Sequence, residues 1–197
     1  MKNKILFWLV GFVLMTSCSS EDIDYYPKPR GFLKMDFPEK VFTTYRGDCP
    51  YTFEIPEYFE VIDKGQNCNK DINMPRFKAS LFLTYLSLDT NLMTNVEYSR
   101  KLVYDHSIKA DEIREAKVHI SKNSVYGTKY KIIGDAASPY QFYVTDSINH
   151  FLRGALYFNA RPNYDSLKPS LVYVLEDVEH MIETINWNPQ SDSLMVQ

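Results

Sequence analysis

The chain has 197 residues, of which 45% are hydrophobic, 15% aromatic and 24% charged. This composition is typical of a folded globular protein and excludes a disordered or collagen-like chain. The net charge is −3, without a basic stripe, which argues against nucleic acid as a partner because such binding depends on neutralising phosphates. The 15 Tyr and 12 Phe against only 7 Gly favour a sheet-rich fold with aromatic cross-strand pairs.

Residues 1–17 have the pattern of a signal peptide. Lys2 and Lys4 precede an unbroken run of apolar residues and Gly from Ile5 to Met15. As a helix this run would rise only about 16 Å, roughly half the hydrocarbon thickness of a bilayer. It therefore predicts a cleaved secretory signal and not a membrane span.

The sequence Met15-Thr16-Ser17-Cys18 resembles a bacterial lipobox. The resemblance implies cleavage before Cys18 and acylation of that residue with fatty acids such as palmitate. Two or three acyl chains, at about 0.8 kcal/mol per buried methylene, would fix the protein to a membrane. The alternative is a plain secretory signal with an incidental cysteine.

The residues after Cys18 bear on its location in the cell envelope. No Asp directly follows the cysteine, unlike in lipoproteins that some bacteria retain in the inner membrane. We therefore expect an outer-membrane anchor facing the periplasm. The acidic cluster from Glu21 to Asp24 also resembles surface-export tags, so surface exposure stays open.

Residues 18–30 predict a tether that lifts the folded body off the lipid. The segment Tyr25-Tyr26-Pro27-Lys28-Pro29-Arg30 is interrupted by prolines and polar, so it should be extended and stiff. Aromatic and cationic side chains on a stiff backbone suit docking at low entropic cost. Tyr25, Lys28 and Arg30 are therefore candidate partner-binding residues.

Residues 31–188 predict one globular domain, and residues 189–197 a flexible tail. The strands expected in the first half of the domain are Phe32–Phe37, Tyr51–Ile55, Tyr58–Ile62 and Phe77–Tyr85. The last is the clearest, because its apolar side chains alternate with polar ones. Thr94-Asn95-Val96-Glu97 fits a capping box and predicts a helix that ends near Asp105, followed by one or two helical turns over Lys109–Glu115.

The second half of the domain predicts a meander and a helix. The expected strands are Ala116–Ser121, Tyr126–Gly134, Tyr140–Asp146 and Phe151–Asn159. An apolar stripe from Leu171 to Ile185 then predicts a helix, with Pro169 in its first turn. The pattern favours an α+β fold, a mostly antiparallel sheet flanked by helices, which resembles the Mog1/PsbP type of α/β/α sandwich.

Cys49 and Cys68 are the two cysteines of the body. Outside the cytoplasm they predict a disulfide that closes a loop of about 20 residues, worth roughly 3 kcal/mol. The alternative is a pair of free or metal-binding thiols, but no His or other Cys stands near either at ligand spacing.

Motifs of catalysis are missing from the sequence. The four histidines are scattered, and there is no Gly-x-Ser-x-Gly elbow, phosphate-binding Gly-rich loop or dinucleotide fingerprint. We therefore expect no catalytic residues, metal or cofactor, and a protein that is not an enzyme. Acid–base catalysis by scattered carboxylates stays open.

Arg153 is a further candidate contact residue. It lies in His150-Phe151-Leu152-Arg153-Gly154, where a strand is expected to start after a hairpin. The segment is either a contact surface or a buried aromatic strand with one satisfied arginine.

Long matching segments make the chain similar to the gliding-motility lipoprotein D family of gliding bacteria. Those segments lie in the tether, around Cys49 and through the meander: Tyr25 with Pro27–Gly31, Phe37–Lys40, Cys49–Glu54, Ile108–Asp111, Val125–Gly127, Ala136–Ser138, Gln141–Tyr143 with Thr145–Ser147, His150–Asn159, and Pro162–Asn163 with Asp165–Leu167. The resemblance implies a non-enzymatic envelope component needed for gliding and type IX protein secretion. Its partners would be protein subunits of that apparatus.

Two functional hypotheses follow. The first is a lipid-anchored assembly module that supports the motility and secretion machinery through a protein-binding face. The second is a lipoprotein that binds a small ligand or peptidoglycan fragment, or an enzyme acting on one. The second requires a deep pocket with converging polar groups.

The lipid anchor gives the first testable prediction. Metabolic labelling with an alkyne fatty acid should tag the full-length protein, and the Cys18→Ala variant should lose the tag because the acylated thiol is gone. Labelling that persists in the variant would disprove acylation at this residue.

Overall fold

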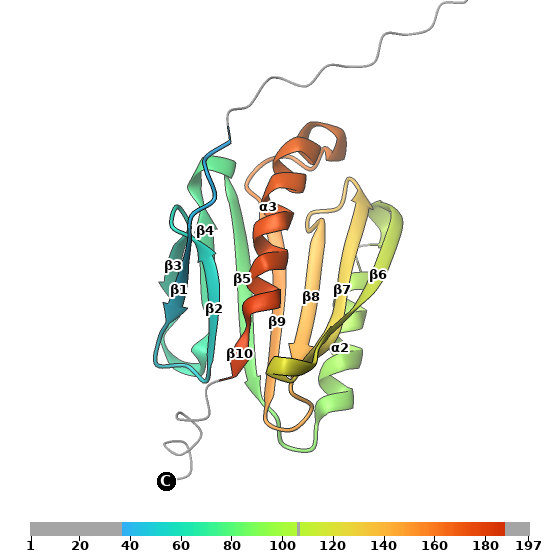
Figure 1. Cartoon of the computed structure of the whole chain (residues 1–197). Coiled ribbons are helices and arrows are strands. Elements are labelled where there is room, and N and C mark those ends of the chain that lie inside the picture. The colour runs from blue at the N-terminus through green and yellow to red at the C-terminus, as the bar shows by residue number, and fades with distance from the viewer. Residues whose placement is uncertain (1–36, 106, 188–197) are drawn as a thin grey trace, which may run out of the picture. The chain divides into compact units, whose positions relative to one another are not determined.

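The computed structural model describes residues 37–105 and 107–187. Figure 1 shows a large twisted sheet with helix α3 and a small sheet on one face and helix α2 on the other. The helices are α2 (Leu92–Tyr104) and α3 (Tyr164–Thr184). None of the described helices is both long enough and apolar enough to cross a bilayer.

All pairings in the two described sheets are antiparallel. The large sheet contains, in spatial order, β3 (Glu60–Asp63), β4 (Lys70–Met74), β5 (Ala79–Ser87), β9 (His150–Phe158), β8 (Tyr140–Thr145), β7 (Val125–Gly134) and β6 (Ala110–Ile120). The small sheet contains β1 (Phe42–Arg46), β2 (Tyr51–Pro56) and β10 (Asn186–Trp187). The predicted α+β class is confirmed, and the layers are consistent with the Mog1/PsbP type.

Helix α2 carries the chain from β5 to β6 at the far edge of the large sheet, and the meander β6-β7-β8-β9 then returns to β5. Strand β6 is therefore an edge strand, with β7 as its described neighbour. Strands β6 and β7 therefore lie at the edge of the large sheet that is farthest from the small sheet (Figure 1).

The main core lies between the large sheet and the layer formed by α3 and the small sheet. The alternating residues Ala79, Leu81, Leu83 and Tyr85 of β5 are buried in this core, as the sequence predicts. So is the apolar stripe of α3, which consists of Leu171, Val174, Leu175, Val178, Met181 and Ile182. Burying whole side chains of this kind contributes about 1.5–3 kcal/mol each.

Both predicted helix starts are wrong. Helix α2 begins two residues before Thr94, because the carbonyl of Asn91 already accepts the amide of Asn95 at 3.1 Å. Helix α3 begins at Tyr164, because the side chain of Asn163 accepts the amide of Ser166 at 3.1 Å and caps the helix there. Pro169 therefore lies inside α3 and not in its first turn.

The helical turns predicted over Lys109–Glu115 are also wrong. Apart from Lys109, this segment belongs to β6, which pairs with β7 from Ala110 to Ile120. Ladder hydrogen bonds and packing outweigh the weak local helix preference here. Strands β1 and β4 were not predicted, because β1 is largely exposed and β4 mixes Lys70, Asp71 and Asn73 with its apolar residues. The predicted strand Phe32–Phe37 lies outside the described residues except for Phe37, which is not in a strand.

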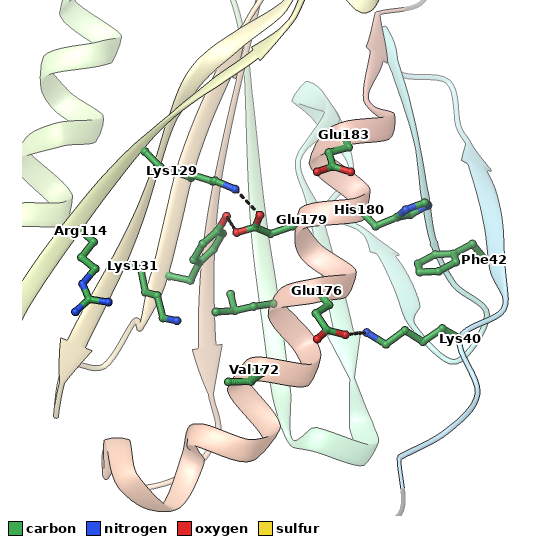
Figure 2. A pocket seen from close by; sticks show the side chains of 13 residues that line it. Lys40, Phe42, Arg114, Lys129, Lys131, Val172, Glu176, Glu179, His180 and Glu183 are labelled. Carbon is green, nitrogen blue, oxygen red and sulfur yellow. Dashed lines mark hydrogen bonds and ion pairs between the residues drawn. The ribbon is translucent and has the colours of Figure 1, made fainter.

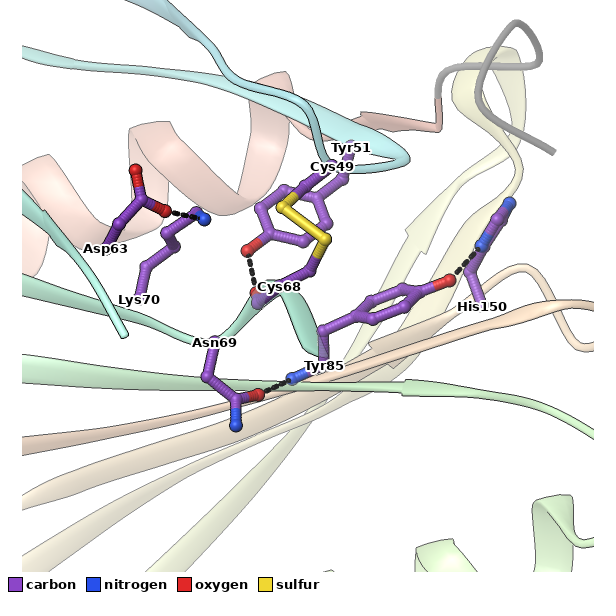
Figure 3. The surroundings of a disulfide bond; sticks show 8 residues. All are labelled: Cys49, Tyr51, Asp63, Cys68, Asn69, Lys70, Tyr85 and His150. Atoms are coloured by element: carbon purple, nitrogen blue, oxygen red, sulfur yellow. Dashed lines mark hydrogen bonds and ion pairs between the residues drawn. A yellow bond between two sulfur atoms is a disulfide. The ribbon is translucent and has the colours of Figure 1, made fainter. Parts of the chain in front are cut away.

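The structure contains the predicted disulfide between Cys49 and Cys68 (Figure 3). It joins the start of β2 to the turn before β4. The hydroxyl of Tyr51 donates to the carbonyl of Cys68 at 2.5 Å, and the side chain of Asn69 accepts the amide of Tyr85 at 2.9 Å. The bond and its neighbours thus tie the small sheet to the large one.

Replacing Cys49 and Cys68 together by Ala should lower the free energy of unfolding by about 3 kcal/mol, the loop-closure value for a separation of 19 residues. Urea denaturation of the oxidised protein and the double variant measures the difference. Reductant should destabilise the wild type by a similar amount and leave the variant unchanged. Equal stability of the oxidised wild type and the variant would show that the bond does not stabilise the fold.

Candidate functional site

An open groove of about 650 Å³ extends along α3, over β6 and β7 on one flank of the helix and to Lys40 and Phe42 on the other (Figure 2). It lies on the α3 side of the large sheet, where α3 leaves the outer strands uncovered. A smaller hollow of about 190 Å³ shares Lys129, Glu179 and Glu183 with it, so the two are continuous along α3.

The helix wall of the groove is acidic. Val172, Glu176, Glu179 and Glu183 recur every three or four residues and therefore lie on one flank of α3. The neighbouring face of the helix is the apolar stripe buried against the sheet. The burial of that stripe fixes the rotation of α3. Glu179 then points toward Lys129 of the strands, whereas Glu176 points toward Lys40 on the other flank of the helix (Figure 2).

The strand wall of the groove is basic. Lys129 and Lys131 alternate along β7 and so point to the same face, and Arg114 of β6 stands directly opposite Lys131. Like charges opposite each other in a sheet are destabilising. Glu112 offsets this repulsion, because it accepts two hydrogen bonds from Arg114 at 2.7 and 2.8 Å. In the described chain, Lys131 has no ion-pair partner.

Glu179 connects the two walls. Its carboxylate forms an ion pair with Lys129 and accepts a hydrogen bond from the hydroxyl of Tyr140 at 3.2 Å. Tyr140 is almost fully buried. Burial and the charge of Glu179 raise the pKa of Tyr140 well above its usual value, so its hydroxyl remains a hydrogen-bond donor at neutral pH.

Lys40 lines the groove on the other flank of α3, on the side of the small sheet (Figure 2). Its ammonium lies 2.8 Å from Glu176 and 2.8 Å from Asp177, whose side chain is fully buried in α3. The other carboxylate oxygen of Asp177 accepts the hydroxyl of Tyr58 at 2.8 Å. Burial lowers the pKa of Lys40, but hydrogen bonds to Asp177 and Glu176 outweigh it and the pKa is raised. Lys40 is therefore a permanent cation at physiological pH.

His180 and Phe42 line the groove on the same side of α3 as Lys40, beside the small sheet (Figure 2). The imidazole of His180 lies 2.8 Å from a carboxylate oxygen of Glu54 in β2, and the ring of Phe42 lies 3.9 Å from the imidazole between centroids. In the sequence, His180 is one of four scattered histidines. Its partner lies 126 residues away in the chain, so no local pattern could have revealed the pair.

The residues predicted from sequence do not form this groove. Cys18, Tyr25, Lys28 and Arg30 lie outside the described residues. Arg153 lies on the opposite face of the sheet, because it donates to Gln141 at 2.6 Å and Gln141 points away from its groove-lining neighbour Tyr140. Burial lowers the pKa of Arg153. This position matches the partly buried, satisfied arginine that was one of the two interpretations.

The described residues do not form a cluster of metal ligands. The described residues contain no group of three or more His, Cys, Asp or Glu side chains placed to hold a metal ion. The carboxylates Glu176 and Glu179 are engaged with Lys40 and Lys129. What the groove offers is a surface with charge of opposite sign on its two walls.

Comparison with known proteins identifies the family of the chain. The profile of a family described as gliding motility lipoprotein GldD matches residues 22–187. The chain belongs to this family. A search of curated proteins found no match. Membership associates the chain with gliding motility and, as a lipoprotein, with the cell envelope.

The ion pair between Lys40 and Asp177 gives a stability prediction. Lys40→Met should lower the free energy of unfolding by about 3 kcal/mol, because it leaves the buried carboxylate of Asp177 without a counter-charge. Lys101→Met, which breaks an exposed pair with Asp105 on α2, should cost less than about 0.5 kcal/mol. Thermal denaturation of both variants measures the difference. Equal losses would show that the buried pair is no more important than an exposed one.

Proposed function

We propose that the protein is a lipid-anchored envelope component that supports assembly or stability of the gliding motility and type IX protein secretion machinery. The observation that carries this proposal is the groove with oppositely charged walls, found in a chain of the gliding motility lipoprotein GldD family. The groove would dock a protein subunit of the apparatus. The proposed role is non-catalytic and needs no cofactor.

The anchor completes the proposal. Residues 1–17 direct export, Cys18 carries the lipid, residues 18–30 form the tether and residues 31–188 the docking domain, followed by a tail at 189–197. The lipid places the domain at the outer membrane, facing the periplasm. An anchored domain cannot diffuse away, so even a modest affinity for the neighbouring subunit keeps the complex together.

The groove suits a protein segment for two reasons. Its helix wall includes exposed apolar surface at Val172, 45% exposed, beside the charged residues. Lys131 and Glu183, which belong to opposite walls, lack ion-pair partners in the part of the chain that the structure describes. A segment with charges of both signs can bind them together, and such complementarity sets the orientation of the bound segment.

A small ligand is the second candidate, and the size of the groove favours it. A volume of about 650 Å³ falls in the range of small-molecule sites. A peptidoglycan fragment is an example of such a ligand. The engagement of Glu176 and Glu179 by lysines favours docking over catalysis, because paired carboxylates are poorly placed to exchange protons with a substrate.

Charge reversal in the groove tests the proposal in a gliding bacterium that expresses the full-length protein. Lys131→Glu combined with Glu183→Lys should abolish both colony spreading and export of type IX cargo, because the complementary charges on the partner then repel the groove. Glu97→Lys on α2, at an exposed position away from the groove, is the matched control. It should leave both processes unchanged.

Protein abundance on an immunoblot must stay constant for the comparison to hold. Normal spreading and export in the double variant would remove the groove as the docking site. Loss of both processes with a partner subunit becoming unstable is the expected result.

A further inference from the structure

The segment of residues 37–41 lies against α3 without belonging to a sheet. It has no regular secondary structure. Two of its backbone carbonyls accept hydrogen bonds, that of Val41 from the amide of Glu57 at 2.9 Å and that of Pro38 from the hydroxyl of Tyr173. We call residues 37–41 the strap. Side-chain contacts are therefore the main interactions that hold the strap in place.

Lys40 is the centre of these contacts. Its ammonium is bound by the carboxylates of Glu176 and Asp177 and donates to the backbone carbonyl of Tyr173 at 3.2 Å. It also lies 4.1 Å from the centre of the Tyr173 ring, within the range of a cation–π interaction. Figure 2 shows Lys40 reaching across to Glu176 on α3. Four groups of α3 thus surround one ammonium, which makes this a built site for a lysine side chain.

Phe37 holds the other end of the strap. Its ring stacks on that of Tyr173 with centroids 4.3 Å apart and an angle of 10° between planes, yet 39% of the residue is exposed. The ring of Phe77 is a second neighbour, with centroids 6.2 Å apart, so this end of the strap is held by aromatic contacts at the surface. An exposed contact of this kind separates more easily than the sheet that follows it.

We propose that the strap is releasable, and that Lys40 occupies in cis an ammonium site that a lysine of a partner protein takes when the strap lifts. The strap comes immediately before β1 (Phe42–Arg46) in the chain, so the strap can lift without unpairing β1. Lifting Lys40 would leave Glu176 and Asp177 uncompensated. The identity of the incoming group as a partner's lysine rests on the proposed function; the releasable strap does not.

Chemical rescue tests the ammonium site without knowledge of the partner. Lys40→Ala removes the side chain beyond Cβ, which n-propylammonium reproduces in shape and charge. Adding n-propylammonium to the variant should raise its melting temperature in a saturable way, whereas 1-propanol or sodium chloride at equal concentration should not. The wild type, whose site is filled, should show no saturable rise, and neither should Lys40→Ala combined with Asp177→Asn.

Hydrogen exchange tests the strap in a variant that keeps Lys40. Phe37→Ala should speed exchange of the Glu57 amide, which donates to the strap carbonyl of Val41, by about tenfold or more while the amides of β2 are unchanged, since local opening needs no global unfolding. This measurement also decides the matter if Lys40→Ala does not fold. Exchange of the Glu57 amide that changes only together with β2 would overturn the releasable strap.

Equal responses of Lys40→Ala and the wild type to n-propylammonium would overturn the ammonium site. If rescue succeeds while charge reversal in the groove leaves motility intact, the site stands as an intramolecular latch and the proposed docking function fails. The two proposals can therefore fail separately.

Discussion

A carboxylate buried within α3 imposes the main constraint on this structure. Asp177 has no exposed surface, and an unpaired charge in such a place is very costly. Lys40 supplies the counter-charge from the segment before β1, and Tyr58 supplies a hydroxyl from the turn after β2. The requirements of one side chain therefore bring together α3, the small sheet and the point where the N-terminal segment joins the domain.

The groove follows from the mismatch between a wide sheet and a single helix. Helix α3 buries its apolar stripe against the centre of the sheet, next to the small sheet, and leaves β6 and β7 open on that face (Figure 1). Glu179 on the unburied part of α3 then points toward these strands, whereas Glu176 and His180 point toward the small sheet (Figure 2). Lys129 and Glu179 bridge the gap, so the walls are held at a fixed spacing. A preformed surface of this kind loses little entropy when a partner docks.

Sequence patterns predicted the elements whose side chains repeat regularly. The alternation in β5, the four-strand meander and the apolar stripe of α3 were all visible, because burial on one face leaves a periodic trace. The long edge strand β6 was partly mistaken for helix, because its exposed charges carry no such trace. The groove was not predicted at all. The spacing of Glu176, Glu179 and Glu183 can be seen in the sequence, but only the tertiary fold shows that Glu179 meets Lys129 and that Glu176 meets Lys40.

Site-specific photo-crosslinking in the native envelope tests the central claim, that the groove docks a protein subunit, most directly. A benzophenone amino acid replaces Ala116 on the groove floor or Phe82, an exposed residue on the opposite face of the sheet, in the full-length lipoprotein. The account predicts a discrete crosslinked subunit of the motility and secretion apparatus from position 116, lost when Lys131 and Glu183 are reversed in charge, and none from position 82. Identical crosslinks from both positions, or crosslinks that survive the charge reversal, would contradict it.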